Sequence, residues 1–496
     1  MALLSLWQDR HPRPPTPEAS VTGEYDVVVV GGGLTGLTTA LLIARAGQSV
    51  AVLEARRVGA GTTGGSTAKV SLLQGTQLSK IARRHSAEVV RTYLEANREG
   101  QAWLSRFCAD HDVDTQRRAA YTFGFGERGA ASARAELEVA RAAGLPVTWL
   151  DRPSLPFPTT GAVGLDDQLQ VDPVELLEAL RRQTEAHGGT VIEGARVQHV
   201  AGRDPVAVVT DAGKVSAGSV VLATNMPILD RGAFFARAAP ARSYGLAFRT
   251  PGPAVDGMWL SADSPSRSLR DAPADDGSVL LVGGNGHPTG RGGSTVQRFD
   301  DLRSWTAEYY PGATETHAWS AQDFVPHHAL PYVGPLLPNH DEILVAGGYS
   351  KWGMTNAVAA SLALSARILD GHVAWAEALL PWRSTELRGL TDVLKINGEV
   401  GFEMTRGWIR PLFSPGVGAA PGEGDGHVRL DHIGTPTASA RVDGVDHRVS
   451  AVCTHLGGIV AWNDAERSWD CPLHGSRFDH DGDVLDAPAT CGLSRR

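Results

Sequence analysis

The sequence predicts a two-part protein: a large α/β part built on a βαβ unit, followed by a small all-β domain near the C-terminus. Three observations carry this prediction. Over residues 25–54, an apolar segment ending in glycines precedes an apolar helical segment and a second apolar segment, the order of a βαβ unit. Residues 412–427 are rich in Gly and Pro, which is typical of a linker. The residues after them are β-patterned and full of turns.

Length, charge and cysteine content narrow the class of protein. A chain of 496 residues has the length of two to four domains. Its net charge of −9 and its aromatic content of 6% argue against nucleic acid as the main partner. Four cysteines are too few for a disulfide framework and are expected to be reduced ligands or thiols. Glycines interrupt the longest uncharged run, and the first residues lack the basic region of a secretory signal. We therefore expect a cytoplasmic protein with no membrane span.

The chain divides into four expected regions. They are an N-terminal tail over residues 1–24, an α/β part over 25–382, a linker region over 383–427 and the small domain over 428–496. A domain as small as the last one needs an additional stabilising element, such as a bound metal.

Periodicity and capping residues predict the elements of the large part. Asp172, Pro173 and Gly188 have the residue types of an N-cap, a first helical position and a helix stop. Further helices are expected near 77–111, 130–143 and 355–369. Strands are expected at 49–54, 190–193, 207–210, 219–223, 244–249, 278–282 and 342–346.

The first chemical motif is a glycine-rich turn between a predicted strand and a predicted helix. Gly31, Gly33 and Gly36 form a G-x-G-x-x-G, in which they permit a tight turn, close approach of a pyrophosphate, and helix–strand packing. The helix N-terminus offers N–H groups and a positive dipole end to phosphates. Glu54 ends the second predicted strand, where an acid accepts hydrogen bonds from a ribose. The pattern indicates a dinucleotide site, and the alternative is an ordinary glycine-rich turn.

Three further segments resemble the D-amino-acid oxidase-like flavoproteins, which include glycine and sarcosine oxidases. Residues 55–67 (ARRVGAGTTGGST), with Gly61 and Thr62, are similar to the second glycine segment of that family. Residues 220–225 (VVLATN), with Thr224, resemble a strand that lies beside the FAD, although Asn225 replaces the usual glycine. Residues 344–355 (LVAGGYSKWGMT), with Gly348, Gly353 and Met354, resemble the turn and helix that cover the flavin ring.

This resemblance implies FAD as the cofactor and an α/β, Rossmann-like FAD-binding domain interleaved with an α+β substrate domain. A second nucleotide site is not expected, because the glycines after Gly283 are read as a loop that cannot start a phosphate-binding helix. Electrons are therefore expected to come from a small organic substrate. Lys351, Tyr244 and Gln322 are candidate catalytic residues, and an exposed surface lysine is the alternative interpretation of Lys351.

The second chemical motif pairs cysteine with histidine near the C-terminus. Cys453 and His455 form a C-x-H, and Cys471 and His474 form a C-x-x-H. Two thiolates and two imidazoles are the ligands of a Rieske [2Fe–2S] centre, and a structural Cys₂His₂ zinc site is the alternative. Residues 453–458 (CTHLGG) and 471–479 (CPLHGSRFD) resemble the two cluster loops of the Rieske family, which favours the iron–sulfur cluster.

Departures from the Rieske pattern suggest which kind of redox partner exchanges electrons with the cluster. Gly458 and Leu473 stand where quinol-oxidising Rieske proteins carry a disulfide, and Phe478 replaces the usual tyrosine. Ser476 is placed to hydrogen-bond a cluster sulfur. Loss of the tyrosine donor is expected to lower the reduction potential. These differences argue for a soluble redox partner protein and against a respiratory quinol-oxidising complex.

Together the motifs predict an FAD-dependent oxidoreductase. It would oxidise a small organic substrate, an amine or amino acid, and pass electrons from the flavin to the Rieske cluster. One alternative is an oxidase that returns electrons to O₂, with a structural or regulatory Rieske domain. The other is a non-catalytic electron-transfer module between protein partners.

Overall fold

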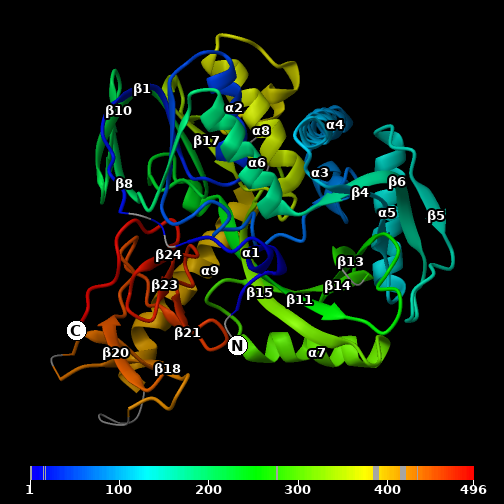
Figure 1. Cartoon of the computed structure of the whole chain (residues 1–496). Helices are drawn as coiled ribbons and strands as arrows, with labels where there is room; N and C mark the ends of the chain where they lie inside the picture. The colour runs from blue at the N-terminus through cyan, green and yellow to red at the C-terminus, as the bar shows by residue number, and fades with distance from the viewer. Residues whose placement is uncertain are drawn as a thin grey trace.

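The computed structural model describes residues 3–14, 16, 18–274, 277–383, 390–413, 420–432 and 434–496. Two large sheets make up the first part of the chain, and two small sheets make up the end (Figure 1). Part of the expected Gly/Pro-rich linker, residues 414–419, lies outside the described residues.

The first large sheet has parallel strands at its centre. Its order is β16 (Tyr332–Leu337), β17 (His340–Gly347), β10 (Gly213–Asn225), β1 (Glu24–Val30), β2 (Val50–Glu54) and β7 (Thr190–Glu193), with β9 (Val206–Thr210) and β8 (Val197–Gly202) attached beyond β10. The last four residues of β1 are all valine and all buried. Continuous apolar strands of this kind are expected where both faces of a parallel sheet are covered.

Helices from distant parts of the chain pack beside this sheet. They are α2 (Leu34–Arg45), α6 (Pro173–Ala186), α8 (Gly353–Ile368) and α4 (Ala87–Asp110), and they lie side by side at the top of the molecule (Figure 1). Asp172 caps α6 by accepting hydrogen bonds from the backbone N–H groups of Val174 and Glu175, which confirms the predicted start of that helix. One large apolar core joins these helices to the sheet.

The second large sheet is mixed and lies beside the first. Its order is β15 (Thr314–Pro326), β11 (Ala238–Arg249), β14 (Gly277–Pro288), β13 (Arg267–Ala274), β12 (Met258–Ser261), β4 (Thr115–Phe123), β6 (Ala162–Val171) and β3 (Lys69–Val70), with β5 (Thr148–Leu150) paired to β6. The helices α7 (Val296–Tyr309), α5 (Glu127–Ala142) and α3 (Gln77–Ala82) belong to this half. The two sheets and their helices form the α/β FAD-type fold with an interleaved α+β domain, as predicted.

Some elements differ from the sequence expectation. The helix expected near 77–111 is two helices, α3 and α4. The first ends with Arg83 as its C-cap, and Ser86 caps the start of the second by accepting a hydrogen bond from the N–H of Val89. The glycines from Gly283 to Gly286, expected in a loop, continue strand β14, and α7 begins later, at Val296. The N-terminal segment, expected as a tail, contributes the short helix α1 (Leu6–Arg10), whose Trp7 is fully buried.

The C-terminal domain contains two small antiparallel sheets. The first is β18 (Gly426–Leu430), β19 (Pro436–Val442) and β20 (Val445–Ser450), and the second is β21 (Ala461–Asn463), β22 (Ser468–Asp470), β23 (Arg477–Asp479) and β24 (Val484–Asp486). Helix α9 (Leu390–Ile409) lies within the region expected as a linker, and Val400 and Met404 on it pack against the core of this domain. Figure 1 shows the domain, in orange and red, beside both large sheets.

Candidate active site and cluster-binding site

The glycine motif forms a turn that only glycine can complete. Gly31 follows β1 with a φ of +107°, in a region that side chains disfavour. A Cβ on Gly36 would lie 1.9 Å from the carbonyl oxygen of Gly31. Gly33 is the N-cap of α2 and has no side chain to occupy the helix N-terminus. The N–H of Leu34, the first residue of α2, donates a hydrogen bond to the Thr63 hydroxyl at 3.3 Å. Gly33, Leu34 and Thr63 all line the cavity at this helix N-terminus, which is the place where a pyrophosphate binds in such motifs.

Glu54 borders the same space at the end of β2. One carboxylate oxygen accepts a hydrogen bond from the N–H of Gly32 at 2.7 Å, and the other accepts one from the N–H of Arg56 at 2.9 Å. These two bonds hold the carboxylate beside the glycine turn, where a ribose acid is expected.

A cavity of about 1030 Å³ extends from the glycine turn to the second sheet. Eight of the ten residues predicted to bind FAD line it: Gly31, Gly33, Glu54, Gly61, Thr62, Thr224, Gly353 and Met354. Gly36 and Gly348 do not, since Gly36 packs on Gly31 and Gly348 faces Pro326 and Tyr332. The volume of the cavity is at the upper end of the range usual for ligand sites. The glycine turn at residues 31–36, called the glycine cradle below, has the form expected of an FAD-binding turn.

The predicted catalytic candidates occupy different positions in this cavity. Lys351 is exposed at the cavity wall, and its ammonium donates a hydrogen bond to the Ser243 hydroxyl at 2.7 Å. Desolvation by the surrounding cavity lowers its pKa. The Tyr244 hydroxyl lies 2.8 Å from Nε2 of His287. Burial raises the pKa of Tyr244 and lowers that of His287 to about 4. At neutral pH both members of this pair are therefore uncharged.

Gln322 has a different environment. Its side-chain amide donates to the carbonyl oxygen of Gly475 at 2.8 Å, and its side-chain oxygen accepts from the Thr289 hydroxyl at 2.7 Å. Both polar groups of Gln322 are therefore used where the first part of the chain meets the C-terminal domain. The side chain joins the two domains at the wall of the cavity.

Sequence reasoning missed one cavity residue of evident chemical interest. Lys69 on β3 lines the cavity, and its ammonium donates a hydrogen bond to the hydroxyl of Ser268. Burial, assisted by the charge of Arg270, lowers its pKa to about 7. No motif surrounds Lys69 in the sequence, so only the folded sheet reveals its position.

The four predicted cluster ligands lie together in the C-terminal domain. The thiols of Cys453 and Cys471 are hydrogen-bonded to each other, which lowers the pKa of Cys453. The rings of His455 and His474 have centroids 5.1 Å apart. Nδ1 of His474 is buried and has no hydrogen-bond partner among the described residues. A buried, unpaired imidazole nitrogen beside two thiols is what a [2Fe–2S] cluster requires of its ligands.

Neighbouring residues agree with the expected departures from the quinol-oxidising pattern. A Cβ on Gly458 would lie 2.6 Å from the Leu473 side chain. The two positions therefore face each other, and neither residue can form the disulfide of quinol-oxidising Rieske proteins. Ser476 is fully buried and its side chain hydrogen-bonds Cys453. Phe478 is also fully buried and offers no hydroxyl.

The histidine side of this site faces the first part of the chain. The Phe235 ring contacts both histidines edge-on, with centroid distances of 5.4 Å to His455 and 4.9 Å to His474. Asp230 accepts a hydrogen bond from Nε2 of His455 at 2.6 Å. With Nε2 occupied, Nδ1 of His455 is the nitrogen available to a metal, as it is in His474.

Buried ion pairs hold the two domains together. Arg242 on β11 pairs with Glu466 of the C-terminal domain through two hydrogen bonds, one of them at 2.7 Å. Arg477 lies 3.2 Å from Glu466 and 2.9 Å from Asp486. Arg56, in the glycine segment beside the cavity, lies 3.6 Å from Asp486. The charges of Arg242 and Arg477 lower the pKa of Glu466 to about 2. Arg242 is therefore already paired within the protein.

The C-terminal domain also completes the wall of the cavity. Leu485, Asp486, Ala487, Ala489 and Thr490 line the same space as Gly31 and Glu54. The glycine cradle and the cluster-binding domain thus border the same cavity.

The fold and these two sites define a flavin-dependent oxidoreductase that carries a Rieske iron–sulfur domain. The family model for FAD-dependent oxidoreductases of the DAO type matches residues 26–367, and the Rieske [2Fe-2S] domain model matches residues 420–494. The chain belongs to the DAO family of FAD-dependent oxidoreductases, and its cofactors are FAD and a Rieske [2Fe–2S] cluster. In the residues that the structure describes, no helix is long and apolar enough to cross a membrane.

One relative is similar to this chain over nearly its full length. The protein YhfW of Bacillus subtilis (strain 168), named as a Rieske 2Fe-2S iron–sulfur protein, is 30% identical over 98% of this chain and 96% of its own length. The cytochrome b6-f complex iron–sulfur subunit of Nostoc punctiforme is 47% identical over 49 residues, which are 10% of this chain and 27% of that protein.

Solved structures share the fold of the first part. Glycine oxidase from Geobacillus kaustophilus has a TM-score of 0.62 and 21% identity, covering 73% of this chain and 99% of its own. L-proline dehydrogenase from P. horikoshii has a TM-score of 0.61 and 17% identity, covering 73% and 98%.

Proposed function

We propose that this protein oxidises an amine or amino acid at the FAD and passes the electrons to its own Rieske cluster, from which a soluble redox partner protein takes them. One observation carries the proposal: residues 485–490 of the C-terminal domain help to line the cavity that holds the glycine cradle. FAD accepts two electrons as hydride, whereas a [2Fe–2S] cluster takes one electron at a time. The protein's own contribution is to hold both groups in one rigid arrangement.

A chain of contacts supports direct transfer between the two sites. The Thr62 hydroxyl, in the glycine segment beside the cavity, donates to the backbone oxygen of Gln322 at 2.6 Å. The Gln322 side chain then donates to the carbonyl oxygen of Gly475, the residue after the cluster ligand His474. A Cβ on Gly475 would lie 2.5 Å from Pro240, another cavity residue. The cluster loop is thus packed directly on the cavity wall.

Two lysines that line the cavity, Lys69 and Lys351, suit a small organic substrate. Lys69 and Lys351 each bond a serine hydroxyl of the second sheet, Ser268 and Ser243. The charge of Asp323 acts on Lys351, whereas Lys69 is next to the positive charge of Arg270. The positive charges around Lys69 favour an anionic group in the cavity, as an amino acid carries. Relatives of this fold are named as a glycine oxidase and an L-proline dehydrogenase, which supports the amine or amino acid class.

The residues proposed to hold the cofactors are those that the sequence predicts. For FAD they are Gly31, Gly33, Glu54, Gly61, Thr62, Thr224, Gly353 and Met354, which line the cavity, together with Gly36 and Gly348, which do not. For the cluster they are Cys453, His455, Cys471 and His474. A location in the cytoplasm stays a prediction of the sequence.

The test is anaerobic EPR of the purified protein mixed with a panel of amino acids and secondary amines. We expect a reduced Rieske signal to develop as the flavin absorbance bleaches. Bleaching with a silent cluster that dithionite still reduces would overturn the transfer step and favour an oxidase that uses O₂. If neither cofactor responds, the substrate class is wrong and a protein donor becomes the better hypothesis.

A matched pair of variants isolates the contact chain. Gln322→Leu removes the bond to Gly475, whereas Gln297→Leu alters an exposed glutamine on α7. We expect Gln322→Leu to slow cluster reduction several-fold while substrate still bleaches the flavin at the normal rate, and Gln297→Leu to change neither. Equal slowing of both steps in Gln322→Leu would indicate damage to the cavity itself.

A further inference from the structure

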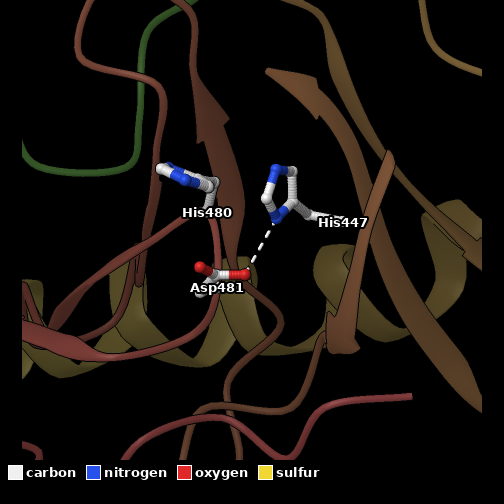
Figure 2. A group of neighbouring side chains, drawn as sticks. All are labelled: His447, His480 and Asp481. Atoms are coloured by element: carbon white, nitrogen blue, oxygen red, sulfur yellow. Dashed lines mark hydrogen bonds and ion pairs between the residues drawn. The ribbon is translucent and has the colours of Figure 1, made fainter. Parts of the chain in front are cut away.

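A second group of metal-ligating side chains lies in the C-terminal domain, outside the cluster site. It consists of His447 on β20 and of His480 and Asp481 in the turn between β23 and β24. Figure 2 shows the hydrogen bond between His447 and Asp481, with Nδ1 of His447 at 2.8 Å from a carboxylate oxygen, and the His480 side chain beside this pair. The His447 and His480 rings are edge-on, with centroids 4.4 Å apart.

The spacing of the ligand atoms suits a small divalent cation. One ligand atom from each residue lies within 4.8 Å of the other two. Ligands bound tetrahedrally to Zn²⁺ at about 2.0–2.1 Å lie about 3.4 Å from one another. Binding of the ion therefore requires the side chains to turn toward it. All three residues are partly accessible, so an ion can enter from solvent and keep water as a further ligand.

The surroundings hold the group in position. The Asp479 carboxylate accepts hydrogen bonds from the N–H groups of Asp481 and Asp483, both at 2.9 Å. Gly482 has a φ of +90°, and a Cβ there would lie 2.8 Å from the carbonyl oxygen of Leu493. The turn that carries His480 and Asp481 is therefore closely packed. The nearby Arg495 pairs with Asp483 at 3.7 Å, and the Asp481 carboxylate is hydrogen-bonded to Nδ1 of His447.

We propose that His447, His480 and Asp481 bind a divalent cation of the Zn²⁺ type, and that this ion links the two sheets of the C-terminal domain. Two imidazoles and a carboxylate are ligands that Zn²⁺ and its first-row neighbours accept. The cation takes the position of the hydrogen between His447 and Asp481, and the neutral imidazole then carries its hydrogen on Nε2. His447 belongs to the β18–β19–β20 sheet, while His480 and Asp481 join two strands of the other sheet.

The test measures Zn²⁺ binding to the full-length protein carrying FAD and the cluster. Zinc and iron are quantified by mass spectrometry after equilibration with Zn²⁺ and desalting, and the affinity is measured by calorimetry. We expect about one zinc per chain with no loss of iron. His480→Asn and Asp481→Asn should each weaken binding at least as much as the 10–100-fold typical of losing a ligand's hydrogen-bond partner.

The control is His427→Asn, which alters a partly buried histidine of β18 in the same domain, outside the group. It should bind Zn²⁺ as the unaltered protein does. The proposal is overturned if His480→Asn and Asp481→Asn bind Zn²⁺ as well as His427→Asn does, or if zinc is gained only as iron is lost. The iron and FAD contents of each variant show that it has folded.

A second measurement tests the link between the sheets. An ion that binds only the folded domain raises its unfolding temperature, by an amount that grows with the ratio of ion concentration to Kd. We expect Zn²⁺ to raise the unfolding temperature of the unaltered protein and of His427→Asn, and to leave that of His480→Asn unchanged. Binding without any shift in the unaltered protein would overturn the structural role.

Discussion

The cluster-binding site and the FAD cavity are built in opposite ways. Four ligands within 22 residues, from Cys453 to His474, come from two loops of one small domain. The cavity draws on segments from Val30 to Thr490, which include the C-terminal domain itself. A site of the first kind depends on a few donor atoms, whereas a site of the second kind depends on the packing of whole domains. The expectations below test this difference, beginning with the largest effect.

Removing one thiolate should abolish the cluster and leave the flavin. In Cys471→Ser we expect iron content to fall to background, because a serine hydroxyl does not replace a thiolate as a ligand of a Rieske centre. FAD content, measured by absorbance after release, should be unchanged. Cys491→Ser is the control, since Cys491 is exposed and outside the predicted ligand set. Loss of FAD together with iron would show that the cavity needs the cluster for its assembly.

Filling the glycine cradle should have the converse effect. Gly36→Ala places a methyl group 1.9 Å from the Gly31 carbonyl oxygen, so α2 must move away from β1. We expect FAD affinity to fall at least about tenfold, with iron content unchanged. Gly126→Ala is a suitable control, because nothing lies within 4 Å of the added methyl group. Equal FAD binding in both variants would contradict the assignment of the cradle.

Breaking the buried ion pair between the domains should lower stability moderately. Glu466→Gln leaves the fully buried Arg242 with only the more distant carboxylate of Asp486, at 4.0 Å, and the loss of a buried ion-pair partner typically costs about 3–5 kcal/mol of unfolding free energy. We expect a lower denaturation midpoint and slower cluster reduction by substrate. Glu185→Gln is the control, because it removes a surface partner of Arg181. We expect this variant to lose about 0.5 kcal/mol or less of unfolding free energy.

The same pair predicts how stability depends on pH. Because the folded state lowers the pKa of Glu466 to about 2, this carboxylate stabilises the protein fully above its unfolded pKa of about 4.3. The contribution is lost as pH falls toward 2. Denaturation midpoints measured from pH 7 to pH 3 should therefore fall less steeply in Glu466→Gln. Parallel curves for the two proteins would contradict the lowered pKa.

The smallest effect concerns the potential of the cluster. Asp230→Asn replaces the half-exposed carboxylate that bonds His455 with a neutral amide. A negative charge beside the histidine favours the more positive, oxidised cluster. We expect the midpoint potential to rise by tens of millivolts, comparable with the ~59 mV of a tenfold one-electron effect. Redox titration followed by EPR measures it, and an unchanged or lowered potential would contradict this geometry.

Sequence reasoning worked best where the chemistry is local. The G-x-G-x-x-G turn, the Asp172 cap and the cysteine–histidine pairs each lie within a few residues, and backbone sterics or ligand spacing determine their form. The sequence did not reveal the buried Trp7 of the N-terminal segment, the continuation of β14 through Gly283–Gly286, or helix α9. Each of these depends on partners far away in the chain, which local patterns do not identify.

The roles of the candidate catalytic residues illustrate the same limit. Gln322 and Arg242 have residue types suited to substrate binding, but the fold uses them to join the domains. Lys69 has no motif around it and lies in the cavity beside Ser268. A side chain's type gives its chemistry, whereas its partners determine whether that chemistry is free to act.

By itself, the sequence determined the two cofactors, because each is bound by short segments whose glycines, thiols and imidazoles have few other uses. Only the tertiary structure placed the histidines of the cluster site against Phe235 and Asp230, and residues 485–490 in the cavity wall. The physical reason is that domain packing arises from many weak contacts and a few buried ion pairs between residues hundreds of positions apart. No single segment of the chain contains that information.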